Sequence, residues 1–192
     1  MTKKDLKNLI LQEMSTYGLT NKNIKEKCLR HKKSYMIWKA VKNLRIYEYC
    51  CESRDKTNCK LLLYLKAIKV KIAERRFNKS CEKVNIELTP HLIEKNIRIC
   101  HGNVIIFGSV GENCIFHGNN VLGNKRTGDK NAIPKLGKNV DVGFGAIIIG
   151  DVEIADNCVI GAGAVVTKSF TKTGTVIAGV PAKEISKGNG NE

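Results

Sequence analysis

The chain has 192 residues, of which 42% are hydrophobic and only 6% aromatic, so aliphatic side chains have to form its core. No apolar run reaches the roughly 18 residues of a membrane-spanning helix. The basic start, MTKKDLKNLI, lacks the apolar stretch and the cleavage site of a secretory signal. The net charge of +15 is concentrated in residues 1–83, which hold 22 Lys and Arg against 8 Asp and Glu, a net of +14. We therefore expect a cytoplasmic protein with two chemically different parts.

Eight cysteines are present, but none forms a C-x-x-C pair and no paired histidines follow at zinc spacing. We expect free thiols in a reducing compartment and no metal site. The chain has no Walker-type or dinucleotide-binding glycine pattern. No nucleic-acid recognition module accompanies the positive charge, so binding to nucleic acid is not expected.

The basic region, residues 1–83, is expected to be α-helical. Apolar residues recur there at three- and four-residue steps in three segments, 6–14, 34–50 and 59–77. In the third segment this spacing places four aliphatic residues on one face: Leu61, Leu65, Ile68 and Ile72. The lysine-rich outer faces have two interpretations. They are ordinary solvated surfaces, or they contact the anionic inner face of a membrane or an acidic glycan intermediate.

A different periodicity, with a step of six, governs residues 84–186. Aliphatic residues occupy every sixth position in one long run: Leu136, Val142, Ile148, Ile154, Ile160 and Val166. The fifth position of each hexad is small or β-branched: Val140, Ala146, Val152, Cys158 and Ala164. A helix repeats every 3.6 residues and a strand every 2, so six fits neither. The pattern predicts the hexapeptide repeat of a parallel β-helix with three sides per coil, and the first and fifth positions should point inward.

The repeat is interrupted twice. Upstream, the six-residue step is kept by four residues: Val104, Val110, Phe116 and Leu122. Arg98 breaks it, with an isoleucine on either side. Fourteen residues then separate Leu122 from Leu136, and we expect the polar segment 123–135 to be a loop extruded from the coil, because insertions in solenoids map to one face, often the binding face. Residues 187–192 are expected to form a polar tail.

Several segments resemble a known family. DVEIADNCVIGAGAVVTKSF and AGVPAK resemble hexapeptide-repeat acyltransferases. ELTPHLIEKNIRICHG and VGENCIFHGNNVLGNK resemble their serine acetyltransferase branch, which includes relatives encoded with capsule and exopolysaccharide genes. The resemblance implies a left-handed β-helix and a homotrimer. It also implies acetyl-coenzyme A, bound in the groove between subunits, as the donor of an acetyl group to a hydroxyl.

An acceptor hydroxyl needs a base that takes its proton as it attacks the thioester, and histidine suits this role near neutral pH. His101, in RICHG, falls where the family has its catalytic histidine. Glu87, in IELTP, matches the acidic residue that orients this histidine, which is usually Asp in the family. His117 follows the in-frame Phe116, so it should point outward as a substrate contact or a second acid–base group.

The resemblance also implies residues that bind acetyl-coenzyme A. Five residues with little side chain suit close approach of the pantetheine arm: Gly123, Ala146, Gly161, Ala162 and Gly163. Two cations, Lys168 and Lys183, suit its phosphates.

The acceptor is expected at the end of the loop. Serine acetyltransferases usually carry D-R-H-P-K-I there, whereas this chain has DKNAIPKLG at 129–137, with Lys130 and Asn131 as candidate substrate contacts. This departure, together with the short helical region, favours a hydroxyl of a saccharide, such as a capsule, exopolysaccharide or O-antigen precursor. The alternatives are a serine O-acetyltransferase of cysteine biosynthesis and a non-catalytic trimeric β-helix scaffold.

Overall fold

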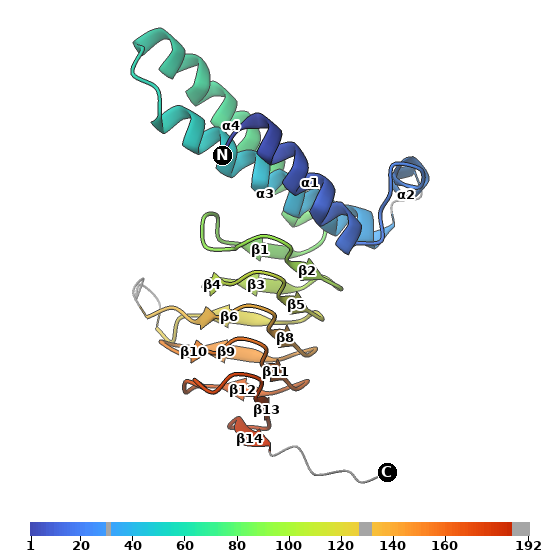
Figure 1. Ribbon diagram of the computed structural model, residues 1–192, viewed down its shortest axis with the longest axis vertical. Coiled ribbons are helices and arrows are strands. Elements are labelled where there is room, and N and C mark those ends of the chain that lie inside the picture. The colour runs from blue at the N-terminus through green and yellow to red at the C-terminus, as the bar shows by residue number, and fades with distance from the viewer. Residues whose placement is uncertain (30–31, 127–131, 186–192) are drawn as a thin grey trace. The chain divides into compact units, whose positions relative to one another are not determined.

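The computed structural model describes residues 1–29, 32–126 and 132–185 of the chain. They belong to two compact units, which meet in the sequence between Asn85 and Ile86. The first unit is helical and the second is built from short strands (Figure 1). None of the helices in the described ranges combines the length and the apolar character that crossing a membrane requires.

The helical unit consists, in its described part, of α1 (Lys3–Thr16), α2 (Ile24–Leu29), α3 (Lys33–Asp55) and α4 (Lys60–Glu82). The first begins with a capping box, in which Thr2 and Asp5 each accept a hydrogen bond from the other's backbone N–H. The long helices α3 and α4 pack on each other, and the rings of Tyr47 and Phe77 stack between them with centroids 6.0 Å apart. The three expected helical segments are confirmed, and α2 was not expected.

The face that α4 buries is not the one expected. Its buried residues are Val70, Ala73, Phe77, Ser80 and Cys81. The four aliphatic residues expected on the buried face are instead between 42% and 72% exposed: Leu61, Leu65, Ile68 and Ile72. Lys66 of the same helix is turned toward α3: its Nζ donates hydrogen bonds to the Ser53 carbonyl in α3 and to Thr57 Oγ1 just after that helix. With this lysine turned toward α3, the leucines of the same turns face solvent.

A buried charge cluster joins α1 to α3. The Arg45 guanidinium donates to Glu13 Oε1 at 2.9 Å and to Glu48 Oε2 at 3.1 Å, and the Arg45 and Glu13 side chains are almost fully buried. Burial by itself would lower the pKa of Arg45, but the two carboxylates outweigh it and raise that pKa. The cluster therefore keeps its charges inside the helical core.

The second unit is a parallel β-helix whose coils contribute strands to three sheets. The first sheet holds β1 (Ile86–Leu88), β3 (Val104–Ile106), β6 (Val121–Gly123), β9 (Ile147–Ile149) and β12 (Val165–Val166). The second holds β4 (Ser109–Val110), β7 (Lys135–Leu136) and β10 (Glu153–Ile154). The third holds β2 (Arg98–Ile99), β5 (Ile115–Phe116), β8 (Asp141–Val142), β11 (Val159–Ile160), β13 (Val176–Ala178) and β14 (Lys183–Ile185). Only the β13–β14 pair is antiparallel among the described strands.

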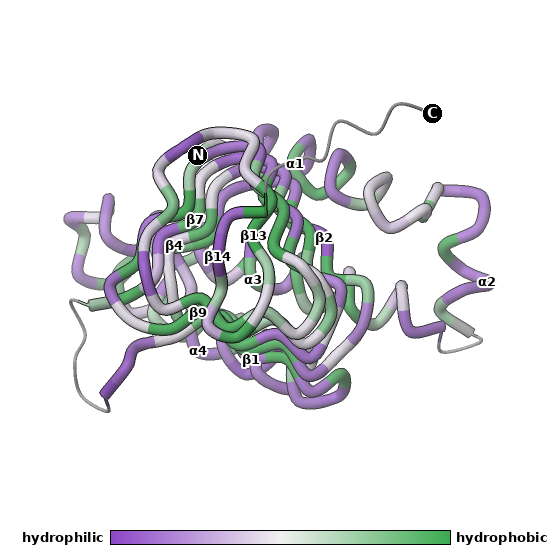
Figure 2. The backbone as a smooth tube through the Cα atoms, turned by 90° about the horizontal axis from the view of Figure 1, so that it is seen from below, coloured by the Kyte–Doolittle hydropathy of each residue, from purple (hydrophilic) through white to green (hydrophobic). Residues whose placement is uncertain are grey.

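The interior of the β-helix is the hexad core that the sequence predicts. All six first-position residues from Leu136 to Val166 are at most 4% exposed, and all five fifth-position residues are at most 2% exposed. Strands of successive coils superpose when this unit is viewed along its stack, with β1 near β9 and β4 near β7 (Figure 2). The buried aliphatic columns supply the hydrophobic stabilisation of a solenoid in which each coil contacts only its neighbours.

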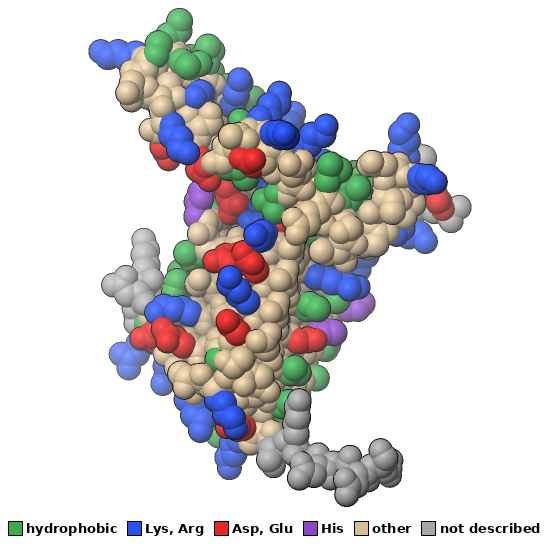
Figure 3. Space-filling view, viewed as in Figure 1, with side chains coloured by type: hydrophobic (Ala, Val, Ile, Leu, Met, Phe, Trp, Pro, Cys, Tyr) green, Lys and Arg blue, Asp and Glu red, His purple; other side chains and the backbone are tan. Residues whose placement is uncertain are grey.

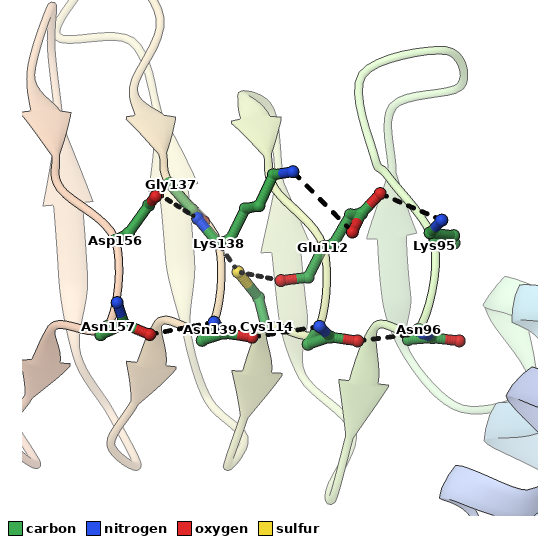
Figure 4. A network of polar contacts seen from close by, with 10 residues as sticks. Lys95, Asn96, Glu112, Cys114, Gly137, Lys138, Asn139, Asp156 and Asn157 are labelled. Carbon is green, nitrogen blue, oxygen red and sulfur yellow. Dashed lines mark hydrogen bonds and ion pairs between the residues drawn. The ribbon is translucent and has the colours of Figure 1, made fainter.

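Asparagines hold one corner of the coils. Asn96, Asn113, Asn139 and Asn157 all have φ between 56° and 62°, a left-handed conformation that Asn tolerates better than most residues. Their side-chain amides form a ladder in which each Nδ2 donates to the Oδ1 of the next coil, at 2.9 to 3.1 Å (Figure 4). The asparagines thus shape the turn and join four coils.

Both interruptions of the repeat have a structural basis. In the first coil Ile93 and Ile99 are buried in place of Leu92 and Arg98, so the frame is shifted by one residue, and a step of only five residues from Ile99 to Val104 restores it. The second interruption lies between β6 and β7, where the pairing of Ile115 with Asp141 spans 26 residues instead of the 18 between Asp141 and Val159. The middle of this insertion, residues 127–131, lies outside the described residues.

Candidate active site

His101 lies in the shortened corner that follows β2, and its side chain is exposed. On the next coil it faces Gly118, where an added Cβ would be only 2.6 Å from the His101 Cβ and 3.3 Å from Cε2 of Phe144. Gly118 also has a φ of +126°, so glycine is required there for both space and backbone conformation. Three consecutive coils therefore place His101, Gly118 and Phe144 in one column.

His117 and Asp141 form an imidazole–carboxylate pair beside this column. Nε2 of His117 and Oδ1 of Asp141 are 2.8 Å apart, and both side chains are a little under half exposed. The His117 main-chain N–H donates to the Val142 carbonyl, which fixes the coil-to-coil register of the pair. A carboxylate bonded to one ring nitrogen orients the imidazole. Histidine, acidic and hydrophobic side chains gather at the right-hand edge of this unit in Figure 3.

Glu87 occupies a different side of the coil. It lies on β1 in the first sheet, in register with Ile105 of β3, and its side chain faces outward. His101 follows β2 in the third sheet. Within the described ranges no hydrogen bond or ion pair joins Glu87 to His101. The structure gives a carboxylate partner to His117 instead, and the pairing of Glu87 with His101 stays a prediction.

A separate row of three small residues lies in register with His117 on the following coils and forms a small-residue track along the third sheet: Gly143, Gly161 and Ala178. An added Cβ on Gly143 would be 2.5 Å from the main-chain N of Ala162, and one on Gly161 would be 3.0 Å from the Ala178 Cβ. Ala178 is paired with Lys183 of β14. The small-residue track therefore runs from the imidazole of His117 to the strand that carries a cation.

The remaining candidate cofactor residues are spread over the unit. Ala162 and Gly163 are exposed beside Gly161, and a Cβ on Gly123 or Gly163 would meet no atom within 4 Å. The Lys168 ammonium lies 5.5 Å from the centroid of the Phe170 ring. Four residues of the expected set are thus exposed, Ala162, Gly163, Lys168 and Lys183, and Gly123 and Gly161 are partly exposed.

Ala146 is a correction to the expected site. It is 0% exposed, and its carbonyl accepts the main-chain N–H of Val121, because it occupies the inward fifth position of its hexad. Its methyl group fills the interior and does not lie on the surface that a cofactor could reach.

Lys130 and Asn131, the candidate acceptor contacts, lie outside the described residues. Four residues of the site were missed in the sequence: Gly118, Asp141, Gly143 and Phe144. The outward orientation of Asp141 and Gly143 could have been predicted, because they flank the in-frame Val142. The sequence does not show which residues of the preceding coil they meet, because the repeat is interrupted by an inserted loop.

The cysteines and acidic residues form no metal site in the part of the chain that the structure describes, since no three His, Cys, Asp or Glu side chains converge. The eight cysteines are free thiols. Burial raises the pKa of Cys81 to about 12 and that of Cys114 to about 11, so these two thiols are unreactive structural residues.

Known proteins are similar to this chain over its β-helix and beyond. Residues 134–168 match the family described as bacterial transferase hexapeptide (six repeats). The serine acetyltransferase of Buchnera aphidicola subsp. Schizaphis graminum is 37% identical over 99 residues, which make up 50% of this chain and 38% of that protein. The serine acetyltransferase of Synechococcus elongatus is 35% identical over 96 residues, 47% of this chain and 38% of that protein. The soybean serine acetyltransferase apoenzyme superposes with a TM-score of 0.71 at 20% identity, covering 95% of this chain and 70% of that one.

These comparisons show a hexapeptide-repeat transferase motif over residues 134–168, a fold shared with a serine acetyltransferase, and sequence similarity to serine acetyltransferases over about half of the chain. The expected fold, helices followed by a left-handed parallel β-helix, is confirmed. The expectation of a saccharide acceptor is wrong, because these relatives are serine acetyltransferases, which favours the alternative of a serine acceptor. The chain spans 38% of the length of these two curated relatives.

Proposed function

We propose that this chain is an acetyl-coenzyme A-dependent serine O-acetyltransferase. The similarity to two serine acetyltransferases, at 37% and 35% identity over about half of the chain, carries the proposal. The geometry supports it, because an exposed imidazole, an imidazole–carboxylate pair and the small-residue track lie together on one sheet.

In the proposed reaction His101 is the general base. Its imidazole takes the proton of the serine hydroxyl as the oxygen attacks the carbonyl carbon of the acetyl thioester. A new C–O bond forms, the C–S bond breaks, and the proton held by the imidazolium passes to the leaving thiolate. The products are O-acetylserine and coenzyme A. Glu87 remains the proposed orienting carboxylate.

Asp141 and His117 are proposed to bind the amino acid. Serine carries an ammonium group, and the Asp141 carboxylate is an accessible counter-charge that is already held in place by His117. The serine carboxylate requires a cation. Arg98 projects outward from β2, one coil before β5, and Lys130 and Asn131 lie in the loop segment that the sequence analysis assigned to the acceptor.

Acetyl-coenzyme A is proposed to lie along the small-residue track. Its pantetheine amides can approach the backbone closely where no side chain intervenes, near Gly143, Gly161 and Gly163. Lys183 and Lys168 then supply positive charge for the phosphates. The same proposal includes a homotrimer, with the donor in the groove between subunits, and a cytoplasmic location.

Release of free thiol from acetyl-coenzyme A tests the proposal. Purified full-length chain is given L-serine, or mono- and oligosaccharides at equal concentration, and the acetylated product is identified by mass spectrometry. We expect thiol release only with serine, matched by O-acetylserine. Turnover with saccharides alone would overturn the assignment of the acceptor, and no turnover with any hydroxyl compound would favour a non-catalytic scaffold.

A further inference from the structure

A pocket of about 530 Å³ opens in the helical unit, between the ends of α3 and α4 and beside α2. Its volume falls in the range of small-molecule sites. One part of its wall is apolar or weakly polar: Cys28, Tyr35, Met36 and Ile46. The other part is cationic: Lys39, Lys42, Arg76, Lys79 and Lys83. Asn43 and Ser80 are also part of the lining, and none of the described residues that line the pocket is a carboxylate.

The five cations are not neutralised by the protein. In the described ranges none of them takes part in an ion pair, although other lysines and arginines of the same unit, such as Arg45 and Lys71, have carboxylate partners. The Lys42 ammonium lies 5.1 Å from the centroid of the Trp38 ring. Burial, and then the charge of the neighbouring Lys39, lower the pKa of Lys42.

The polar residues of the lining are firmly placed. Asn43 donates through Nδ2 to Ser80 Oγ at 3.2 Å and to the Arg76 carbonyl at 3.3 Å, and Ser80 in turn donates to the Phe77 carbonyl. These bonds fix the facing turns of α3 and α4 from which Lys39, Lys79 and Lys83 project. The cations therefore extend from a rigid helix pair and not from a loop.

We propose that this pocket binds a small organic phosphate, with the phosphate among the lysines and Arg76 and the organic part against Met36 and Ile46. Several ammonium groups and a guanidinium fork match the charge and the multiple acceptor oxygens of a phosphate. The apolar wall adds affinity that inorganic phosphate cannot use. The site lies wholly within the helical unit and is independent of the proposed acetyl transfer.

Trp38 provides the readout, because it is the sole tryptophan of the chain and Lys42 lies over its ring. Inorganic pyrophosphate and phenyl phosphate are titrated into the full-length chain at constant ionic strength, with inorganic phosphate and phenol as comparisons. Trp38 emission and calorimetry report binding. We expect saturable binding of phenyl phosphate at least about fivefold tighter than that of inorganic phosphate, and none of phenol.

Matched charge variants separate a built pocket from general positive charge. Lys39→Gln/Lys79→Gln removes two exposed cations of the pocket, and Lys7→Gln/Lys69→Gln removes two exposed cations outside its lining. We expect the first pair to weaken pyrophosphate binding at least about tenfold and the second by less than about twofold. Circular dichroism checks that both double variants stay helical. Arg76→Gln, tested separately, should also weaken pyrophosphate binding.

Three outcomes would overturn the proposal: no saturable binding, an equal loss in both variant pairs, or binding that only a polyanion such as a 20-nucleotide RNA achieves. The last two would show a diffuse basic surface. Activity is not needed for any of these measurements, so failure here leaves the proposed acetyl transfer untouched.

Discussion

Nε2 of His117 lies 2.8 Å from Oδ1 of Asp141, although the two residues are 24 positions apart and belong to neighbouring coils. Cys100 and His101 lie on the coil before His117, on the same side of the β-helix.

His101→Ala should lower turnover with serine at least about a hundredfold, since the hydroxyl would lose its general base. Steady-state thiol release measures the loss, and size-exclusion chromatography checks that the oligomer is unchanged. His91→Asn, at an exposed residue with a φ of 65°, is the control and should remain near wild type. Near-normal activity of His101→Ala would transfer the role of base to His117.

Asp141→Asn should reduce activity by about tenfold, because the carboxylate would no longer hold His117 or attract the serine ammonium. Combining it with His117→Gln should add little, as expected for two residues acting as one unit. Glu153→Gln, which removes an exposed carboxylate paired with Lys135 on another sheet, serves as control. Fully additive losses in the double variant would argue against a functional pair.

Gly118→Ala should damage both the site and the fold. The new Cβ would be 2.6 Å from the His101 Cβ, and a φ of +126° disfavours alanine, so we expect a loss of about 1–3 kcal/mol in the free energy of unfolding and reduced turnover. Gly174→Ala is the control: Gly174 has a φ of +72°, and an added Cβ would meet no atom within 4 Å, so this variant measures backbone strain alone. Equal effects of the two substitutions on activity would rule out a steric coupling between Gly118 and His101.

Two substitutions of Asn139 separate the two roles of the asparagine ladder. Asn139→Ala loses the amide bonds to Asn113 and Asn157 and also strains a φ of 56°, whereas Asn139→Gly loses only the bonds. We expect losses of about 2 and about 1 kcal/mol in the free energy of unfolding, measured by denaturant titration. A larger loss for the glycine variant would contradict this division.

Arg45→Met should be strongly destabilising, because it leaves the carboxylates of Glu13 and Glu48 buried without a counter-charge. Breaking one partner of such a buried cluster costs about 3–5 kcal/mol. Arg54→Met, which breaks the exposed pair with Asp55, should cost less than about 1 kcal/mol. Thermal unfolding followed by helical circular dichroism compares the two variants.

The sequence was most informative where one rule repeats. Each hexad places an aliphatic residue and a small residue inside, so Ile148 and Ala164 could be assigned to the core without a structure. The same rule places Ala146 in the interior, although Ala146 was included among the expected cofactor-binding residues. In α4 the periodicity alone was misleading, because an amphipathic pattern does not show which residues a neighbouring helix covers, and Lys66 turns toward α3 in place of Leu65.

The sequence by itself determined the β-helix and the helical segments before it, because these depend on local periods, and its resemblance to a known family suggested His101 as the candidate base. Only the tertiary structure decided which residues surround that histidine. Stacking of coils brings Gly118 and Phe144 to His101 and Asp141 to His117, and the register of that stacking depends on a five-residue corner and an inserted loop. The cationic pocket likewise exists only where α2, α3 and α4 meet, since the lysines that line it are no different in sequence from the solvated lysines around them.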